Sequence, residues 1–143
     1  MENIFALIGS MFIFFVIGGL VLYVLSSLGL MKIAQSKGIE NSWLAWIPFA
    51  NLYIMGKIVG PFKLIIDISK PEVVLPILVL CSVIPLIGFL CSIAGMILYY
   101  GVLYNIYSQY KQKSAQTMLI LSILLFFMSP IYLFNIGQEV SGN

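Results

Sequence analysis

The sequence predicts an all-α integral membrane protein with four transmembrane helices and one cytoplasmic helical element that lies in the membrane interface or re-enters the bilayer. Hydrophobic residues make up 62% of the 143 residues and charged residues only 8%, against about 25% charged in ordinary soluble domains. Long apolar runs without charge recur along the chain, and the seven basic residues, all lysines, gather in the segments between them. We therefore expect one membrane domain over residues 1–143.

The first apolar run, residues 4–31, contains no charged residue. About 20 such residues cross the hydrocarbon core of a bilayer, so this run predicts the first transmembrane helix. It lacks the basic start and small-residue cleavage site of a secretory signal, which favours a retained helix. Small residues at Gly18-Gly19 and Ser26-Ser27 mark faces on which another helix can pack closely.

Residues 41–60 are as long and apolar as a span, but they contain Pro48, Lys57 and both tryptophans of the chain. If this segment crossed the bilayer, the lysines would be divided between the two faces. If it does not cross, all seven fall on one side, which the positive-inside rule makes the cytoplasm. We therefore expect both termini outside and the segment, broken at Pro48, on the cytoplasmic side, either in the interface or re-entrant.

The following residues extend this interfacial element to residues 41–70. Lys63, Asp67 and Lys70 fall at positions i, i+4 and i+7, the spacing of one polar face of a helix. We expect a short amphipathic helix there. Asn41 and Ser42 are candidate caps for a first short helix after residue 40, and Asn51 for one that starts after the proline.

The next 38 residues, 73–110, contain no charge. As one straight helix they would reach about 57 Å at about 1.5 Å per residue, far beyond one bilayer. Pro85 and Gly88 lie near the middle and indicate a turn. The sequence therefore predicts spans over residues 73–86 and 89–108.

Residues 115–134 predict the fourth span. Pro130 should bend or end that helix near Ser129, because proline disfavours helical geometry in the residue before it. The tail after Phe134 is expected to fray. It carries Glu139 and no lysine, consistent with a location opposite the lysine-rich loops.

Two groups of residues within the predicted spans admit two interpretations. Cys81 and Cys91 flank the predicted turn symmetrically, as apolar fillers or as a disulfide pair. Five tyrosines near the end of the third span are either an interfacial aromatic belt or the lining of a cavity: Tyr99, Tyr100, Tyr104, Tyr107 and Tyr110.

The residue inventory argues against an enzyme. The chain has no histidine and one aspartate, so it offers no catalytic triad, carboxylate pair, zinc-ligand cluster or phosphate loop. We expect no catalytic residue, no metal site and no cofactor. Nucleic-acid binding is not expected either, because the lysines form no basic tract and the net charge is +2.

The candidate contact residues for a partner or ligand lie in the interfacial element: Trp43, Trp46, Asn51, Tyr53 and Lys57. Polar groups in an apolar membrane element often mark functional sites. The alternative is that Asn51 caps a helix and that Lys57 extends its ammonium group to the interface.

The motif W-x-x-x-I-P-x-x-N-x-Y-x-x-x-K-I-x-G runs from Trp43 to Gly60. It resembles the hallmark of a family of small, uncharacterised bacterial multipass membrane proteins, sometimes fused to other membrane modules such as signal peptidases. That family also tends to have I-P-L-x-N later in the chain, where this sequence has Gly88 in place of the asparagine. The resemblance covers roughly residues 30–137 and implies a multipass fold in a bacterial inner membrane, without indicating an activity.

The sequence therefore predicts a non-enzymatic polytopic protein of the cell membrane that acts by binding, as an accessory subunit, an immunity or stress protein, or an assembly factor. Its expected partners are membrane lipid and either another membrane protein or a second copy of itself. The alternative is an oligomeric pore or channel, including a holin-like one, which the small size and the Gly/Ser-containing first helix permit.

Overall fold

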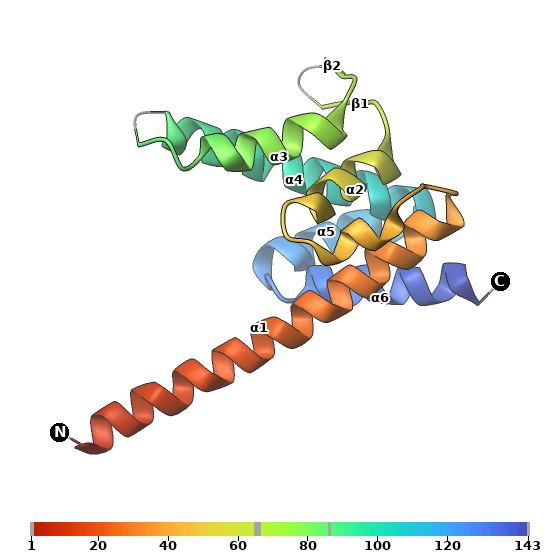
Figure 1. Cartoon of the computed structure of the whole chain (residues 1–143). Helices are drawn as coiled ribbons and strands as arrows, with labels where there is room; N and C mark the ends of the chain where they lie inside the picture. The colour runs from red at the N-terminus through yellow and green to blue at the C-terminus, as the bar shows by residue number, and fades with distance from the viewer. Residues whose placement is uncertain (1, 65–66, 86, 143) are drawn as a thin grey trace.

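A computed structural model describes residues 2–64, 67–85 and 87–142. Six α-helices, one short 3₁₀ helix and one two-stranded hairpin occur in these residues (Figure 1). The all-α prediction is confirmed apart from the small hairpin. In chain order the elements are α1 (Glu2–Ser36), η1 (Ser42–Trp46), α2 (Ala50–Val59), β1 (Phe62–Lys63), β2 (Asp67–Ile68), α3 (Pro71–Cys81), α4 (Gly88–Tyr110), α5 (Ala115–Leu124) and α6 (Met128–Ser141).

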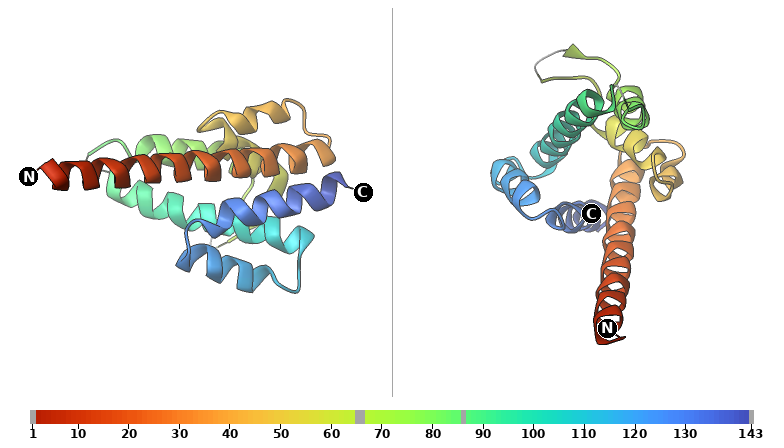
Figure 2. Two further views of the ribbon diagram at one scale, coloured as in Figure 1. Left: turned by 90° about the horizontal axis from the view of Figure 1, so that it is seen from below. Right: turned by 90° about the vertical axis from the view of Figure 1, so that its left-hand side faces the viewer.

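The molecule has two ends of different character (Figures 1 and 2). At one end lie the loop from α1 to η1, the loop from α4 to α5 and the end of α6; we call this the lysine end, because Lys37, Lys111 and Lys113 lie there. The N-terminal half of α1 and the turn between α3 and α4 point the other way. We call that the far end.

The core of the molecule is near the lysine end. The largest fully buried side chains come from the last turns of α1, from α2, from one position of α3, from the lysine-end half of α4 and from the middle of α6: Leu30, Ile33, Ile54, Met55, Ile58, Leu75, Val102, Leu103, Ile106, Tyr107, Leu133 and Ile136. The large apolar residues of α1 from Ile4 to Val21 are instead exposed, as in Phe14 with 76% of its surface accessible. A helix that is apolar all round and not covered by protein is suited to lipid surroundings.

The closest helix packing joins α1 to α6, which run side by side in the same direction (Figure 2). A Cβ on Gly29 would lie 2.3 Å from the carbonyl oxygen of Leu133, and one on Gly137 would lie 2.7 Å from that of Gly29. Ser27, on the same stretch of α1, is completely buried, as the prediction of close packing near Ser26-Ser27 requires. At Gly18-Gly19 that prediction does not hold within this chain, because no atom lies within 4 Å of a built Cβ.

Within the described residues, two helices are long and apolar enough to cross a bilayer: residues 3–36 and α4, of 34 and 23 residues. Four full-length crossings are not confirmed. Helix α3 has 11 residues and α5 has 10, lengths of roughly 16 and 15 Å, about half of a hydrocarbon core of about 30 Å. Helix α4 extends over the residues predicted for the third span.

The amphipathic helix predicted over residues 63–70 is wrong. The chain there forms an antiparallel hairpin in which Phe62 pairs with Ile68 and Lys63 with Asp67. The Lys63 and Asp67 side chains are 3.4 Å apart, so opposite charges four positions apart meet across strands instead of along a helix face. The side chains of Phe62 and Leu64 pack against Gly101 of α4, and the exposed Lys63 lies between them. This alternation has the two-residue period of a strand.

The single helix predicted over residues 115–134 is also wrong. The chain turns at residues 125–127, and α6 continues through the tail that was expected to fray. Pro130 is the third residue of α6, where its missing N–H leaves no helical bond unmade. The break therefore lies before the proline and not at Ser129.

Helix α6 returns to the lysine end. The Lys111 ammonium is 2.7 Å from a Glu139 carboxylate oxygen, and Lys32 donates a hydrogen bond of 2.7 Å to Gln138. The prediction placed Glu139 on the side opposite the lysines. An ion pair of this length contradicts that placement, because the two groups lie at the same end of the molecule.

Candidate binding surface and cavity

The tryptophans lie on η1, which packs on α1. The carbonyl group of Trp46 accepts a hydrogen bond of 2.5 Å from the hydroxyl of Tyr23 on α1. Ala45, which lies between the two tryptophans in the sequence, is buried. Trp43 is 57% exposed and Trp46 38%. The structure therefore fixes the backbone of η1 and leaves the two indoles available on its outer side.

Pro48 breaks the element as predicted, by a visible local mechanism. Ile47 is extended (φ −95°, ψ 124°), the conformation that a following proline favours, and η1 ends there. Phe49 then adopts φ 64°, which is rare for a bulky side chain, and α2 begins at Ala50.

The capping prediction fails at Asn51, and at Asn41 it holds for the position but not for a side-chain bond. Phe49 occupies the N-cap position of α2, so Asn51 is the second residue of the helix and not its cap. Asn41 does hold the N-cap position of η1, in the left-handed conformation (φ 60°), but its side chain makes no capping bond. Asparagine tolerates this conformation better than most residues, which accounts for its place there.

Helix α2 is wedged between its neighbours. Its buried side includes Ile54 and Ile58, and a Cβ on Gly56 would lie 2.3 Å from the backbone of Glu72 at the start of α3. With 10 residues, or roughly 15 Å, α2 is too short to cross a bilayer. It is a packed part of the lysine end.

Tyr53 and Lys57 lie together on the outer side of α2. They are one helical turn apart, and the Lys57 ammonium lies 5.0 Å from the centre of the Tyr53 ring, a cation–π distance. The neighbouring Tyr53 side chain is the main cause that raises the pKa of Lys57. Lys57 is therefore a fixed positive charge at neutral pH. Asn51 is half-buried on the same helix.

The sequence did not single out Lys37, which closes the lysine end of α2. Its ammonium donates a hydrogen bond of 2.7 Å to the carbonyl oxygen of Ile58 and another to the side chain of Gln109 on α4. The Tyr110 ring is 5.7 Å away. Burial among these groups lowers the pKa of Lys37. No local pattern distinguishes this lysine, because its partners lie far away in the sequence.

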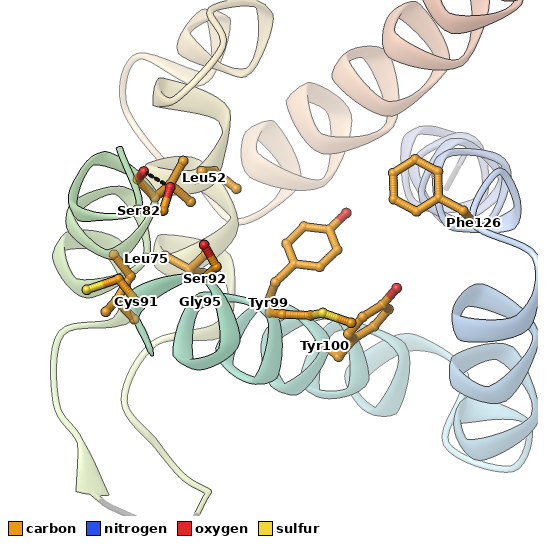
Figure 3. A pocket seen from close by; sticks show the side chains of 12 residues that line it. Leu52, Leu75, Ser82, Cys91, Ser92, Gly95, Tyr99, Tyr100 and Phe126 are labelled. Atoms are coloured by element: carbon orange, nitrogen blue, oxygen red, sulfur yellow. Dashed lines mark hydrogen bonds between the residues drawn. The ribbon is translucent and has the colours of Figure 1, made fainter. Parts of the chain in front are cut away.

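A cavity of about 330 Å³ lies between α3 and α4 (Figure 3). Leu52 of α2 and Phe126 of the α5–α6 turn also reach it, and Tyr99 and Tyr100 form its lysine-end wall. The two tyrosine rings are 5.6 Å apart and edge to face. Two of the five tyrosines thus line a cavity, as one interpretation of the sequence required.

The remaining tyrosines have different roles. Tyr107 is completely buried; its hydroxyl is 3.1 Å from that of Ser122 on α5, and its ring is 5.9 Å from that of Tyr132 on α6. Tyr104 is 37% exposed. A shared interfacial belt does not describe these residues, because Tyr107 belongs to the core.

The cavity has few free polar groups. The hydroxyls of Ser82 and Ser92 donate to carbonyl groups of their own helices, at 2.6 and 2.8 Å, and Cys81 and Cys91 are free thiols. Within the described residues no group of His, Cys, Asp and Glu could hold a metal ion. The cavity therefore offers apolar shape and two phenol groups, which suit binding more than proton transfer.

Comparisons with family models, with curated proteins and with solved structures give no match to this chain. The resemblance carried by the motif from Trp43 to Gly60 therefore stays a prediction. The structure does give that motif a physical description: the break at Pro48, the Tyr53–Lys57 pair and the start of the hairpin after Gly60.

Proposed function

We propose that this chain is a multipass membrane protein that acts by binding another membrane protein, through the surface formed by η1 and the outer side of α2. The observation that carries this proposal is the exposure of Trp43 on an element whose backbone is held by α1. Tryptophan and tyrosine dominate binding hot spots, and a fixed scaffold lowers the entropy cost of binding. Lys57 adds a positive charge to this surface.

The membrane placement in this proposal differs from four simple spans. Helices α1 and α4 cross the bilayer, with the lysine end at the cytoplasmic face, as the positive-inside rule favours. Helices α5 and α6 form a hairpin that enters from that face and returns to it, which the Lys111–Glu139 pair supports. The turn residues Leu125, Phe126 and Phe127 are exposed, and their apolar side chains suit contact with lipid tails.

The proposal assigns no catalysis to this surface. The ammonium of Lys57 faces the Tyr53 ring, and Tyr53, Glu72 and Glu40 all raise its pKa, so Lys57 stays charged instead of exchanging a proton. A second copy of this chain is the other candidate partner.

A photocrosslinking amino acid at position 43, in cells that express the full chain, tests the proposal. We expect a discrete protein adduct that Trp46→Ala and Lys57→Ala each reduce several-fold, at unchanged expression. Lys113→Ala removes an exposed lysine at the same end and should leave the adduct unchanged. If only lipid adducts form, or if all three variants behave alike, the binding surface is elsewhere.

The oligomeric pore stays the alternative class. A water-filled pore needs a polar lining, and the exposed half of α1 presents apolar side chains such as Phe12, Phe14 and Val16 on successive faces. We expect liposomes that contain the purified protein to retain a trapped dye at high protein-to-lipid ratio. Rapid leakage would favour the pore over the binding protein.

A further inference from the structure

A second hollow, a groove of about 460 Å³, lies on the outside of the molecule where the β1–β2 hairpin meets α3 and α4. Its walls come from three elements: Ile68 from the hairpin, Val74 and Leu78 from α3, and Ala94 and Ile97 from α4. The groove is distinct from the surface around Trp43 and does not share residues with it.

The hairpin is held firmly enough to form a wall. Leu64 packs on α4, where a Cβ added to Gly101 would lie 2.9 Å from its Cδ1 atom, and the Phe62 ring lies at 3.5 Å from the same position. Gly101 is buried. The absence of a side chain there thus lets the hairpin approach α4 and leaves the groove open beside it.

The groove has a direction. Lys70 and Ser69 lie at its lysine end, directly before α3 begins, whereas Leu78 and Ala94 lie deeper toward the far end. Along this path the lining changes from charged to wholly apolar. An amphipathic molecule with its head at the lysine end fits this order of side chains.

The charge at the mouth is positive. Asp67 is paired with Lys63 at 3.4 Å, so these two charges offset each other. The ammonium of Lys70 therefore makes the net charge at the mouth of the groove positive. Within the described residues the Lys70 side chain takes part in no hydrogen bond or salt bridge, although its carbonyl oxygen accepts bonds from Val73 and Val74. Glu72 belongs to the other side of α3, against Gly56 of α2.

We propose that this groove binds one anionic glycerophospholipid of the surrounding leaflet, with its phosphate at Lys70 and one acyl chain along Val74, Leu78 and Ala94. Charge complementarity and the apolar depth of the groove select this occupant over a peptide, which would leave its backbone polar groups unpaired against these walls. A lysine near the membrane surface contributes about 1 kcal/mol of attraction to anionic lipid. The inference rests on the proposed membrane placement.

The test is native mass spectrometry of the full-length protein in detergent, titrated with phosphatidylglycerol and with phosphatidylcholine of the same acyl chains. We expect the protein to retain phosphatidylglycerol preferentially. Lys70→Gln should weaken that binding by roughly five-fold without changing phosphatidylcholine binding, whereas Lys70→Arg should preserve it. Ala94→Trp should fill the deep part of the groove and weaken both lipids.

The controls separate this site from general surface charge and bulk. Lys113→Gln removes an exposed lysine outside the groove, and Ala6→Trp adds an indole to the exposed part of α1; neither should change lipid retention. An equal loss in Lys113→Gln, or unchanged binding in Lys70→Gln and Ala94→Trp, overturns the proposal. Displacement of the lipid by soluble glycerol phosphate at equal concentration would also overturn it, because only a phosphate site would then exist.

Carbonate extraction of membranes from the expressing cells separates failure of this inference from failure of the proposed function. Protein released by carbonate would overturn both the membrane placement and the lipid groove. Protein that stays in the membrane but shows no preference for phosphatidylglycerol would overturn the groove alone.

Discussion

The two halves of α1 have the same apolar character but opposite surroundings. Ile33, at the lysine end, is completely buried, whereas Ile17, toward the far end, is 57% exposed. In water, the hydrophobic effect would drive apolar side chains into a packed core. In a bilayer it does not drive helices together, because lipid tails are as apolar as the side chains themselves. Close backbone packing and polar contacts must therefore decide which half is packed.

The lysine end has both kinds of contact. Gly29 and Gly137 bring α1 and α6 together, and Gly56 brings α2 against α3. Tyr107 and Ser122 join α4 to α5 through their hydroxyls. Gly18, in the exposed half of α1, has no neighbour within 4 Å of a built Cβ. Small residues thus permit close packing where a partner helix exists, and their presence alone does not create a partner.

The largest expected effect comes from removing core volume at the packed end. Ile33→Ala should lower the free energy of unfolding by roughly 2–5 kcal/mol, because the cavity cannot collapse fully. Ile17→Ala, on the same helix, should change it by less than about 0.5 kcal/mol. Unfolding of the purified protein by SDS in mixed micelles measures both. Equal effects would mean that the two halves of α1 are packed alike.

Sequence patterns predicted much of the large-scale arrangement. Charge-free runs predicted the two long helices, and Pro85 with Gly88 predicted the turn between α3 and α4, where α4 begins at Gly88. Lysine counting placed Lys37 and Lys111 at one end, as Figure 2 shows for the loops that carry them. These features depend on local composition, which a sequence displays directly.

Features that depend on distant contacts were missed. Nothing near Leu125 indicates the α5–α6 turn, since the only helix breaker, Pro130, lies within the first turn of α6. The tail forms a helix because Gly137 packs against Gly29 of α1, a contact between segments more than 100 residues apart. At the candidate surface, the sequence supplied Trp43 and Lys57 but not Lys37, whose partners Ile58 and Gln109 lie 21 and 72 residues away.

Adding one methyl group at the α1–α6 contact should have the next largest effect. Gly29→Ala forces a Cβ to within 2.3 Å of the Leu133 carbonyl oxygen, so the helices must move apart, at a cost of about 1–3 kcal/mol in the free energy of unfolding. Gly18→Ala meets open space and should be neutral or slightly stabilising, because alanine favours helix. The same SDS unfolding assay compares them. A neutral Gly29→Ala would exclude close packing of α1 and α6.

A smaller effect is expected from a polar contact between helices. Tyr107→Phe removes the hydroxyl that lies 3.1 Å from Ser122, without changing ring packing against Tyr132. Such bonds in membrane proteins contribute on average about 0.6 kcal/mol. Tyr104→Phe, at an exposed tyrosine three residues away, is the matched control and should have no effect. If Tyr104→Phe lowers the free energy of unfolding as much as Tyr107→Phe does, the effect does not come from the contact with Ser122.

The smallest expected effect tests the position of α6, on which the comparison of the two ends depends. Lys111 and Glu139 form a partly exposed ion pair, with 35% and 58% of their side chains accessible. Exposed pairs contribute about 0.2–1 kcal/mol and weaken in salt. Lys111→Gln, Glu139→Gln and the double variant form a thermodynamic cycle that isolates this coupling. We expect a favourable coupling energy in this range at low ionic strength, and a smaller one in high salt.

Glu139→Gln combined with Lys113→Gln, which replaces a lysine of the same loop, should show additive effects. A coupling of zero at low salt would contradict a role of the Lys111–Glu139 pair in holding α6 at the lysine end, and that position would then depend on the Gly29–Gly137 contact and the Lys32–Gln138 hydrogen bond.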